Sequence, residues 1–152
     1  MDNFKLWIDA DACPRDAKDL VYKSAARLNI NVCLVANSYM SIPHSPLIRF
    51  IQVDHGADVA DQYIVDHVNK GDLVITADIP LAAKVVEKEA TAINPRGEIY
   101  TEENISERLS MRDFMSNLRD EGMNTGGPAP YGANDRQSFA NGLNKILTQI
   151  LK

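Results

Sequence analysis

The first 94 residues alternate short apolar runs with segments whose apolar residues recur at helical spacing. Five apolar runs are typical of buried strands: 6–8, 31–36, 48–53, 73–76 and 91–94. Three segments with helical spacing lie between them: 14–28, 58–69 and 79–88. Strands that alternate with helices predict a mostly parallel sheet with helices on both faces. In such a sheet, ligands bind beyond the carboxyl ends of the strands.

The rest of the chain predicts further helices. Thr101 can cap one helix, and Ser110 with Asp113 resembles a capping box that would start a second. A loop rich in glycine and proline spans 124–132, and a last helix begins at about Asp135. We therefore expect an α/β fold with a central sheet of four or five strands and extra C-terminal helices.

Composition limits the kind of protein this is. The 152 residues suit one domain over residues 1–152, and no apolar run approaches the roughly 20 residues that span a bilayer. A net charge of −5 argues against a protein that coats long duplexes by charge alone, although it does not exclude a nucleic-acid enzyme. Cys13 and Cys33 are too few for a disulfide framework, and no secretory signal precedes the first strand, so we expect a cytoplasmic location.

Two aspartates follow the first apolar run directly. Asp9 and Asp11 are two residues apart, so in an extended chain they point the same way. Two bare carboxylates ~4 Å apart repel by about 4 kcal/mol at an effective dielectric of ~20. Such a pair shares a proton, holds a cation or stays apart in water.

More aspartates are expected at the same edge of the sheet. Asp78 follows the fourth strand, and Asp58 and Asp61 lie three residues apart on the helix after the third strand. Oxygen ligands without histidine or cysteine spacing favour Mg²⁺ or Mn²⁺ over zinc. The competing interpretation is helix capping, because aspartate is common at helix starts.

Several residues are candidates for binding a phosphate of the substrate. Three arginines can form bidentate bonds to phosphate, and one loop offers backbone N–H groups and a hydroxyl. These candidates are Arg96, Arg112, Arg136, Thr125, Gly126 and Gly127. The competing interpretations are surface ion pairs for the arginines and a simple turn for the loop.

Two other chemistries remain open. Asp-x-Asp after an apolar strand also begins haloacid-dehalogenase-like phosphatases, in which Asp9 would be the nucleophile and Thr76 and Lys84 would supply later motifs. This alternative ranks second, because no apolar strand after Lys84 precedes a pair of aspartates. Cys13 follows the same aspartates, at a helix start that would lower a thiol pKa, but it has no histidine near it in sequence and is better explained as a small core residue.

Six motifs together resemble the YaiI/YqxD family of bacterial proteins, which is grouped with PIN-like domains. The motifs are DADACP at 9–14, GADVAD at 56–61, GDLVITADIPLA at 71–82, NPRG at 94–97, MRDF at 111–114 and TGGPAP at 125–130. PIN-like domains are largely metal-dependent ribonucleases with a site of four acidic residues. The resemblance spans nearly the whole chain.

The resemblance implies a role for each acidic residue. Asp9 matches the acid after the first PIN strand, Asp78 matches the acid of the Thr/Ser-x-Asp motif, and Asp58 or Asp61 would be the helix acid. Asp11 is our candidate for the fourth. The implied function is a Mg²⁺- or Mn²⁺-dependent nuclease that cleaves phosphodiester bonds, with RNA as the expected partner. DADACP and TGGPAP are not general PIN features, so another substrate, or a binding module without catalysis, stays open.

Overall fold

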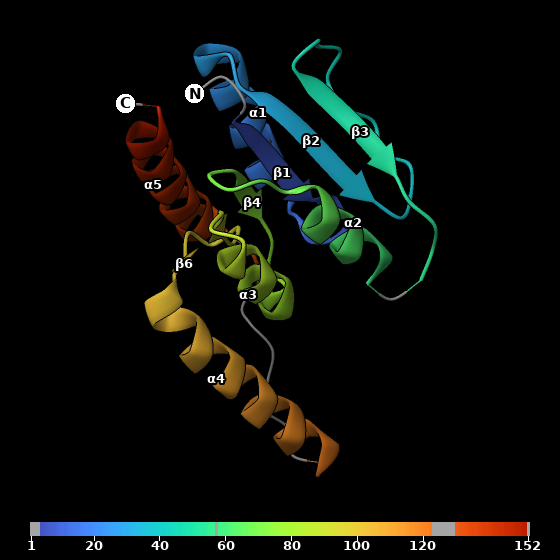
Figure 1. Ribbon diagram of the computed structural model, residues 1–152, viewed down its shortest axis with the longest axis vertical. Coiled ribbons are helices and arrows are strands. Elements are labelled where there is room, and N and C mark those ends of the chain that lie inside the picture. The colour runs from blue at the N-terminus through green and yellow to red at the C-terminus, as the bar shows by residue number, and fades with distance from the viewer. Residues whose placement is uncertain (1–3, 57, 123–129, 152) are drawn as a thin grey trace.

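The computed structural model, which describes residues 4–56, 58–122 and 130–151, contains a central sheet flanked by helices (Figure 1). In this part of the chain the sheet has six strands in the order β3-β2-β1-β4-β5-β6. The strands are β1 (Lys5–Asp9), β2 (Asn31–Ala36), β3 (Ile48–Gln52), β4 (Leu73–Ile75), β5 (Thr91–Ile93) and β6 (Ile99–Tyr100). All neighbouring strands are parallel except β5 and β6. The α/β prediction is confirmed, and the architecture is consistent with a PIN-like fold.

Helices cover both faces of the sheet. The first face packs against α1 (Arg15–Leu28) and α5 (Ala133–Ile150), and the second packs against α2 (Val59–His67) and α3 (Ile79–Glu87). The remaining long helix, α4 (Glu102–Asp120), buries Ile105 near its start and then extends away from the sheet (Figure 1). No helix in the described ranges is both long and apolar enough to cross a membrane.

The alternation of side chains along β1 explains why the sheet is buried on both faces. Leu6 and Ile8 enter the core beneath α1 and α5, whereas Trp7 enters the core beneath α2 and α3. Helix α5 supplies Phe139 and Leu143 to the first core, where both are at most 1% exposed. A strand that is covered on both faces has a continuous run of apolar residues, which is the pattern seen in the sequence.

The structure differs from the prediction at two places beyond β5. The sheet gains a sixth strand, β6, which is only two residues long and therefore leaves little periodicity to detect. The predicted break at Ser110 and Asp113 is wrong, because α4 runs through both residues without interruption. Its 19 residues contain no proline or glycine to end the first helix. The cap at Thr101 is confirmed: its side chain accepts a hydrogen bond from the Asn104 N–H.

The direction in which strands are added to the sheet reverses between β1 and β4. From β1 the chain adds β2 and β3 on one side, then crosses over to add β4 and β5 on the other. The helices that leave the carboxyl ends of β1 and β4 thus cover opposite faces of the sheet. Such a reversal leaves an opening at the carboxyl edge, where α/β proteins bind ligands.

Gly97 allows the turn between β5 and β6 to lie directly against α5. Its φ is +96°, and a Cβ built there would lie 2.5 Å from the backbone oxygen of Ser138. Tyr131 also anchors this turn, because its hydroxyl donates a hydrogen bond to the Pro95 carbonyl at 2.8 Å. Both the backbone conformation and the close approach therefore require glycine.

We expect Gly97→Ala to lower the free energy of unfolding by about 2 kcal/mol, because it combines left-handed strain with a backbone clash. Gly71→Ala is the matched control: its φ is +89°, but a Cβ there meets nothing within 4 Å. The control should cost only about 1 kcal/mol. Urea denaturation followed by circular dichroism measures both, and equal losses would contradict the close approach at Gly97.

Candidate active site

Asp9 is a nearly buried carboxylate at the end of β1. It is 7% exposed, and its Oδ2 accepts a hydrogen bond from the Thr76 hydroxyl at 2.9 Å. Burial raises the pKa of Asp9, the Thr76 hydrogen bond lowers it, and the nearby carboxylates of Asp78 and Asp11 raise it further. The net direction is upward, so ionised Asp9 is unfavourable unless a positive charge lies close by.

Thr76 links Asp9 to Asp78. Its buried hydroxyl donates to Asp9 and accepts a hydrogen bond from the Asp78 N–H at 2.9 Å. Asp78 itself caps α3, because its Oδ1 accepts a hydrogen bond from the Leu81 N–H at 2.9 Å. The Pro80 that follows favours a helix start at this point. These hydrogen bonds fix the ends of β1 and β4 relative to each other.

Asp61 approaches this pair from the first turn of α2. Its carboxyl group lies close enough to that of Asp78 for the two to share a proton, which favours the protonated form of one of them when no cation is present. Burial, then the charges of Asp78 and Asp9, raise the pKa of Asp61 to about 7. We call Asp9, Asp61 and Asp78 the acidic centre. Without a cation, Asp61 is partly protonated at neutral pH.

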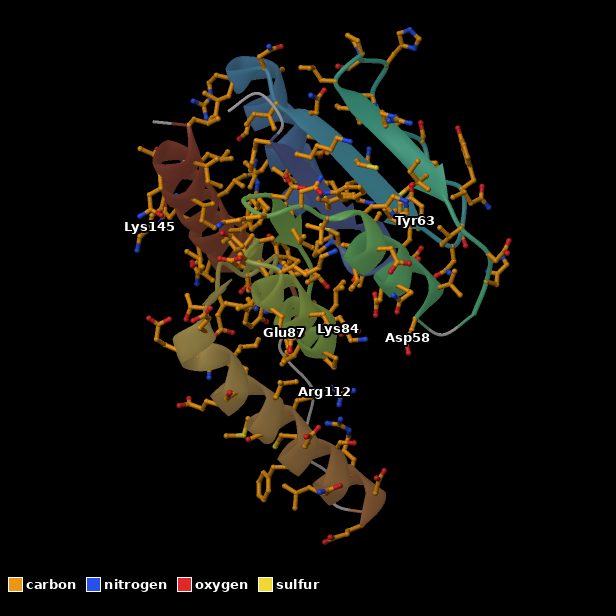
Figure 2. The ribbon with its side chains drawn as sticks, in the orientation of Figure 1. Asp58, Tyr63, Lys84, Glu87, Arg112 and Lys145 are labelled. Atoms are coloured by element: carbon orange, nitrogen blue, oxygen red, sulfur yellow. The ribbon has the colours of Figure 1, made fainter. Side chains whose placement is uncertain are left out.

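Asp11 and Asp58 lie at the edge of the acidic centre. Asp11 is exposed, and its Oδ2 accepts a hydrogen bond from the Asn37 N–H at 2.7 Å. Asp58 precedes α2 with a left-handed φ of 65°, makes no capping hydrogen bond and lies at the outer end of that helix (Figure 2). Both charges act on the centre, since Asp11 raises the pKa of Asp9 and Asp58 raises that of Asp61.

The acidic centre lacks an ion-pair partner in the described part of the chain. None of the ion pairs within the described ranges includes Asp9, Asp61 or Asp78. In the same ranges, no three histidine, cysteine, aspartate or glutamate side chains form a ready-made metal cage. Mg²⁺ takes one or two carboxylates and keeps several waters, so the contacting carboxyls of Asp61 and Asp78 beside Asp9 fit its chemistry.

The predicted phosphate-binding arginines lie on three different elements: the β5–β6 turn, α4 and α5. Arg96 forms an ion pair with Asp135 at 3.0 Å and lies over the Tyr131 ring, so it joins the β5–β6 turn to the start of α5. Arg112 lies on α4, away from the sheet (Figure 2), and Arg136 is exposed in the first turn of α5. The loop candidates Thr125, Gly126 and Gly127 fall outside the described residues.

Cys13 is a core residue in this structure. It is 8% exposed, and burial raises the pKa of its thiol to about 12, with Lys18 lowering that pKa and Asp9 raising it. A thiol with this pKa stays protonated at neutral pH and is a poor nucleophile. The helix-start argument for a reactive thiol is therefore outweighed by burial.

Two polar residues of the site have roles that the sequence analysis did not assign. Thr76 was expected only as part of the Thr/Ser-x-Asp motif or of a phosphatase motif, and its position two residues before Asp78 was the available signal for a role in holding Asp9. Asn37 follows β2, holds Asp11 through its N–H, and donates its side-chain amide to the Asp54 carbonyl at 2.8 Å. Asn37 could also have been found from the sequence, because it is the first polar residue after an apolar run.

The fold and the acidic centre define a class: α/β proteins with carboxylates gathered at the switch point of a parallel sheet. The comparison with known families identifies the particular one. A model described as "Uncharacterized BCR, YaiI/YqxD family" matches residues 7–149, so this chain belongs to the YaiI/YqxD family. The resemblance drawn from the motifs is confirmed.

Curated relatives match over nearly their whole length. A UPF0178 protein of Shewanella sp. (strain MR-7) is 53% identical over 150 residues, which is 99% of both chains. A UPF0178 protein of Syntrophotalea carbinolica is 57% identical over 145 residues, covering 95% of this chain and 98% of the relative. No solved structure gives a significant match.

The raised pKa of Asp61 predicts how stability depends on pH. The folded state keeps this proton up to about pH 7, whereas the unfolded state loses it near 3.8. Metal-free stability should therefore fall as pH rises between these values. Asp61→Asn keeps a hydrogen-bond donor toward Asp78 and removes the free-energy cost of ionising Asp61 in the folded state. Allowing for exposure, we expect it to stabilise the metal-free protein at about pH 8 by on the order of 1 kcal/mol.

Urea denaturation in EDTA, at about pH 4 and about pH 8, measures this effect. Asp66→Asn is the matched control, because Asp66 is exposed on the same helix and bonds only Gln62. A gain at Asp61 that is the same at both pH values would contradict the shared proton.

Proposed function

We propose that this protein is a metal-dependent nuclease that hydrolyses phosphodiester bonds, with RNA as its substrate and the cytoplasm as its location. The observation that carries the proposal is the contact between the Asp61 and Asp78 carboxyls beside the nearly buried Asp9. Such unbalanced charge costs stability, and a hard cation relieves that cost. The PIN-like resemblance supports the same chemistry.

The residues of the site are arranged before any ligand binds. Thr76 and the Leu81 N–H hold Asp9 and Asp78, so these two carboxylates do not need to reorganise. A bound cation would favour the ionised form of Asp61, whose carboxylate would then be available as a ligand. Asp11 and Asp58, at the rim, add negative charge that attracts divalent cations.

Asp9, Asp61 and Asp78 would hold the Mg²⁺ or Mn²⁺, with Asp58 assisting from the rim. When bound, such an ion would polarise the substrate phosphate and lower the pKa of a water molecule. Asp11 is exposed beside Asp9, where it would be able to accept a proton from a water that attacks the phosphate. The scissile phosphate would lie outside the carboxyl ends of β1 and β4.

The first test is cleavage of a panel of single-stranded RNAs with Mn²⁺, with Mg²⁺ and with EDTA. We expect metal-dependent cleavage, and a loss of about 100-fold or more in kcat for Asp9→Asn and Asp78→Asn. Asparagine also caps helices, so Asp78→Asn should keep the start of α3. Asp54→Asn is the control, because Asp54 lies at the same edge of the sheet and contributes only its carbonyl to the hydrogen bonds there.

A readout other than activity comes from the melting temperature. Mn²⁺ should raise it for the wild type and for Asp54→Asn but not for Asp9→Asn, because only ligands that bind the folded state stabilise it. Unchanged cleavage by Asp9→Asn, or an equal Mn²⁺ effect in all three proteins, would refute the assignment.

One contact favours a second candidate, the haloacid-dehalogenase-like phosphatase. In such an enzyme Asp9 would be the nucleophile, with a hydroxyl side chain beside it. The Thr76 hydroxyl donates a hydrogen bond to Asp9 and meets this requirement. The expected lysine partner is not supported, since Lys84 is exposed and forms no ion pair with Asp9 among the described residues. Covalent trapping of Asp9 by beryllofluoride, with hydrolysis of an aryl phosphate, would establish the phosphatase instead. Binding of RNA without any turnover would indicate a non-catalytic module.

A further inference from the structure

A cavity lies on the face of the sheet that carries α2, near the amino ends of β1 and β2. It has a volume of about 380 Å³. Helix α2 packs against both β1 and β2, and Tyr63 lies on the side of α2 that faces β2 and β3 (Figure 2). Nine described residues line this cavity, which we call the basic pocket, and none of them is acidic.

Two basic side chains converge on the floor of the basic pocket. Trp7, Cys33 and Arg49 occupy one row across the three strands, and Lys5 starts the adjacent row. The charges of both Arg49 and Lys5 act on the Cys33 thiol and lower its pKa against the effect of burial, so both lie close to the same atom. Neither forms an ion pair with any described carboxylate, in a chain whose net charge is −5.

The opposite wall of the basic pocket is aromatic. The Tyr63 and His67 rings stack with centroids 4.0 Å apart and an interplanar angle of 18°, and Tyr63 meets the edge of Trp7. Trp7 is fixed by Asp72, which is 1% exposed and accepts its indole N–H at 3.0 Å. This wall is a surface on which a planar ring can stack. It lies near two cations that form no ion pair among the described residues, and Lys5 Nζ lies 5.8 Å from the centroid of the Trp7 ring.

The basic pocket and the acidic centre share two elements. Lys5, Trp7 and Asp9 lie on one face of β1, so the basic end and the acidic end are about 13 Å apart along the strand. On α2, Asp61 faces the acidic centre, whereas Tyr63 and His67 line the pocket. A single extended ligand can therefore contact both.

We propose that the basic pocket binds one nucleotide unit, with its phosphate on Lys5 and Arg49 and its base against Tyr63 and His67. The assignment of that nucleotide to the RNA strand cleaved at the acidic centre rests on the proposed nuclease function. Binding of a nucleotide to the pocket does not. Phosphate takes bidentate bonds from arginine, and bases of any identity stack on aromatic rings, so the pocket would hold the strand without reading its sequence.

Trp7 is the only tryptophan of the chain, and it lines the pocket, so its fluorescence reports binding directly. Adenosine 5′-monophosphate, inorganic phosphate, adenosine and a short oligoribonucleotide should be titrated into the full-length protein in EDTA. We expect the oligoribonucleotide and the mononucleotide to bind more tightly than phosphate or adenosine. Arg49→Gln should weaken both by about tenfold, because it removes a charged hydrogen bond to phosphate. Tyr63→Leu should weaken both and leave phosphate binding unchanged.

Arg27→Gln is the matched control, because it removes the same charge from an exposed position on α1. Equal affinities of Arg49→Gln and Arg27→Gln would overturn the proposal, as would phosphate binding as tightly as the mononucleotide. Mononucleotide binding that depends on Arg49, with oligoribonucleotide binding that does not, would overturn the assignment to a strand.

The two proposals fail separately. If no RNA is cleaved but nucleotide binding depends on Arg49, the nuclease is wrong and the pocket stands. If RNA is cleaved and Arg49→Gln leaves KM unchanged, the pocket assignment is wrong and the nuclease stands. When both hold, Arg49→Gln raises KM by about tenfold with little change in kcat, whereas Asp9→Asn lowers kcat and leaves binding in EDTA intact.

Discussion

The burial of β1 on both faces is the constraint on which the rest of the molecule depends. As the central strand it can carry only apolar side chains between its ends, and Leu6, Trp7 and Ile8 fill two separate cores. Its charged residues are therefore confined to the ends, Lys5 at one and Asp9 at the other. Lys5 is part of the basic pocket and Asp9 is part of the acidic centre. The length of the strand keeps these two sites of opposite charge apart.

The acidic centre combines two kinds of organisation. Hydrogen bonds from Thr76 and the Leu81 N–H position two carboxylates, while Asp61 is held close to them against electrostatic repulsion. The hydrogen bonds stabilise the fold, whereas the close approach of Asp61 is unfavourable without a proton or a cation. Membership of the YaiI/YqxD family places this arrangement among proteins that share motifs along nearly the whole chain. The geometry explains why the DADACP and TADIP stretches belong to one site.

Much of the fold could be predicted because its signals are local. Buried parallel strands give continuous apolar runs, and the carboxyl ends of β1 and β4 meet in any sheet of this order, so Asp9 and Asp78 could be paired from the sequence. Helix α4 was divided wrongly because a capping motif at Ser110 looks the same inside a helix as at its start. The basic pocket depends on the register of Lys5, Cys33 and Arg49 across three strands, and register is not local information.

The position of α5 has a consequence for how the protein is made. Phe139 and Leu143 complete the core beneath Leu6 and Ile8, yet they are far from these residues along the chain. During synthesis, α1 can dock on β1 early, but the surface under β4 and β5 stays open to water until α5 has left the ribosome. The growing polypeptide thus exposes an apolar sheet face from the synthesis of β5 until that of α5, and its final collapse is a late, long-range event.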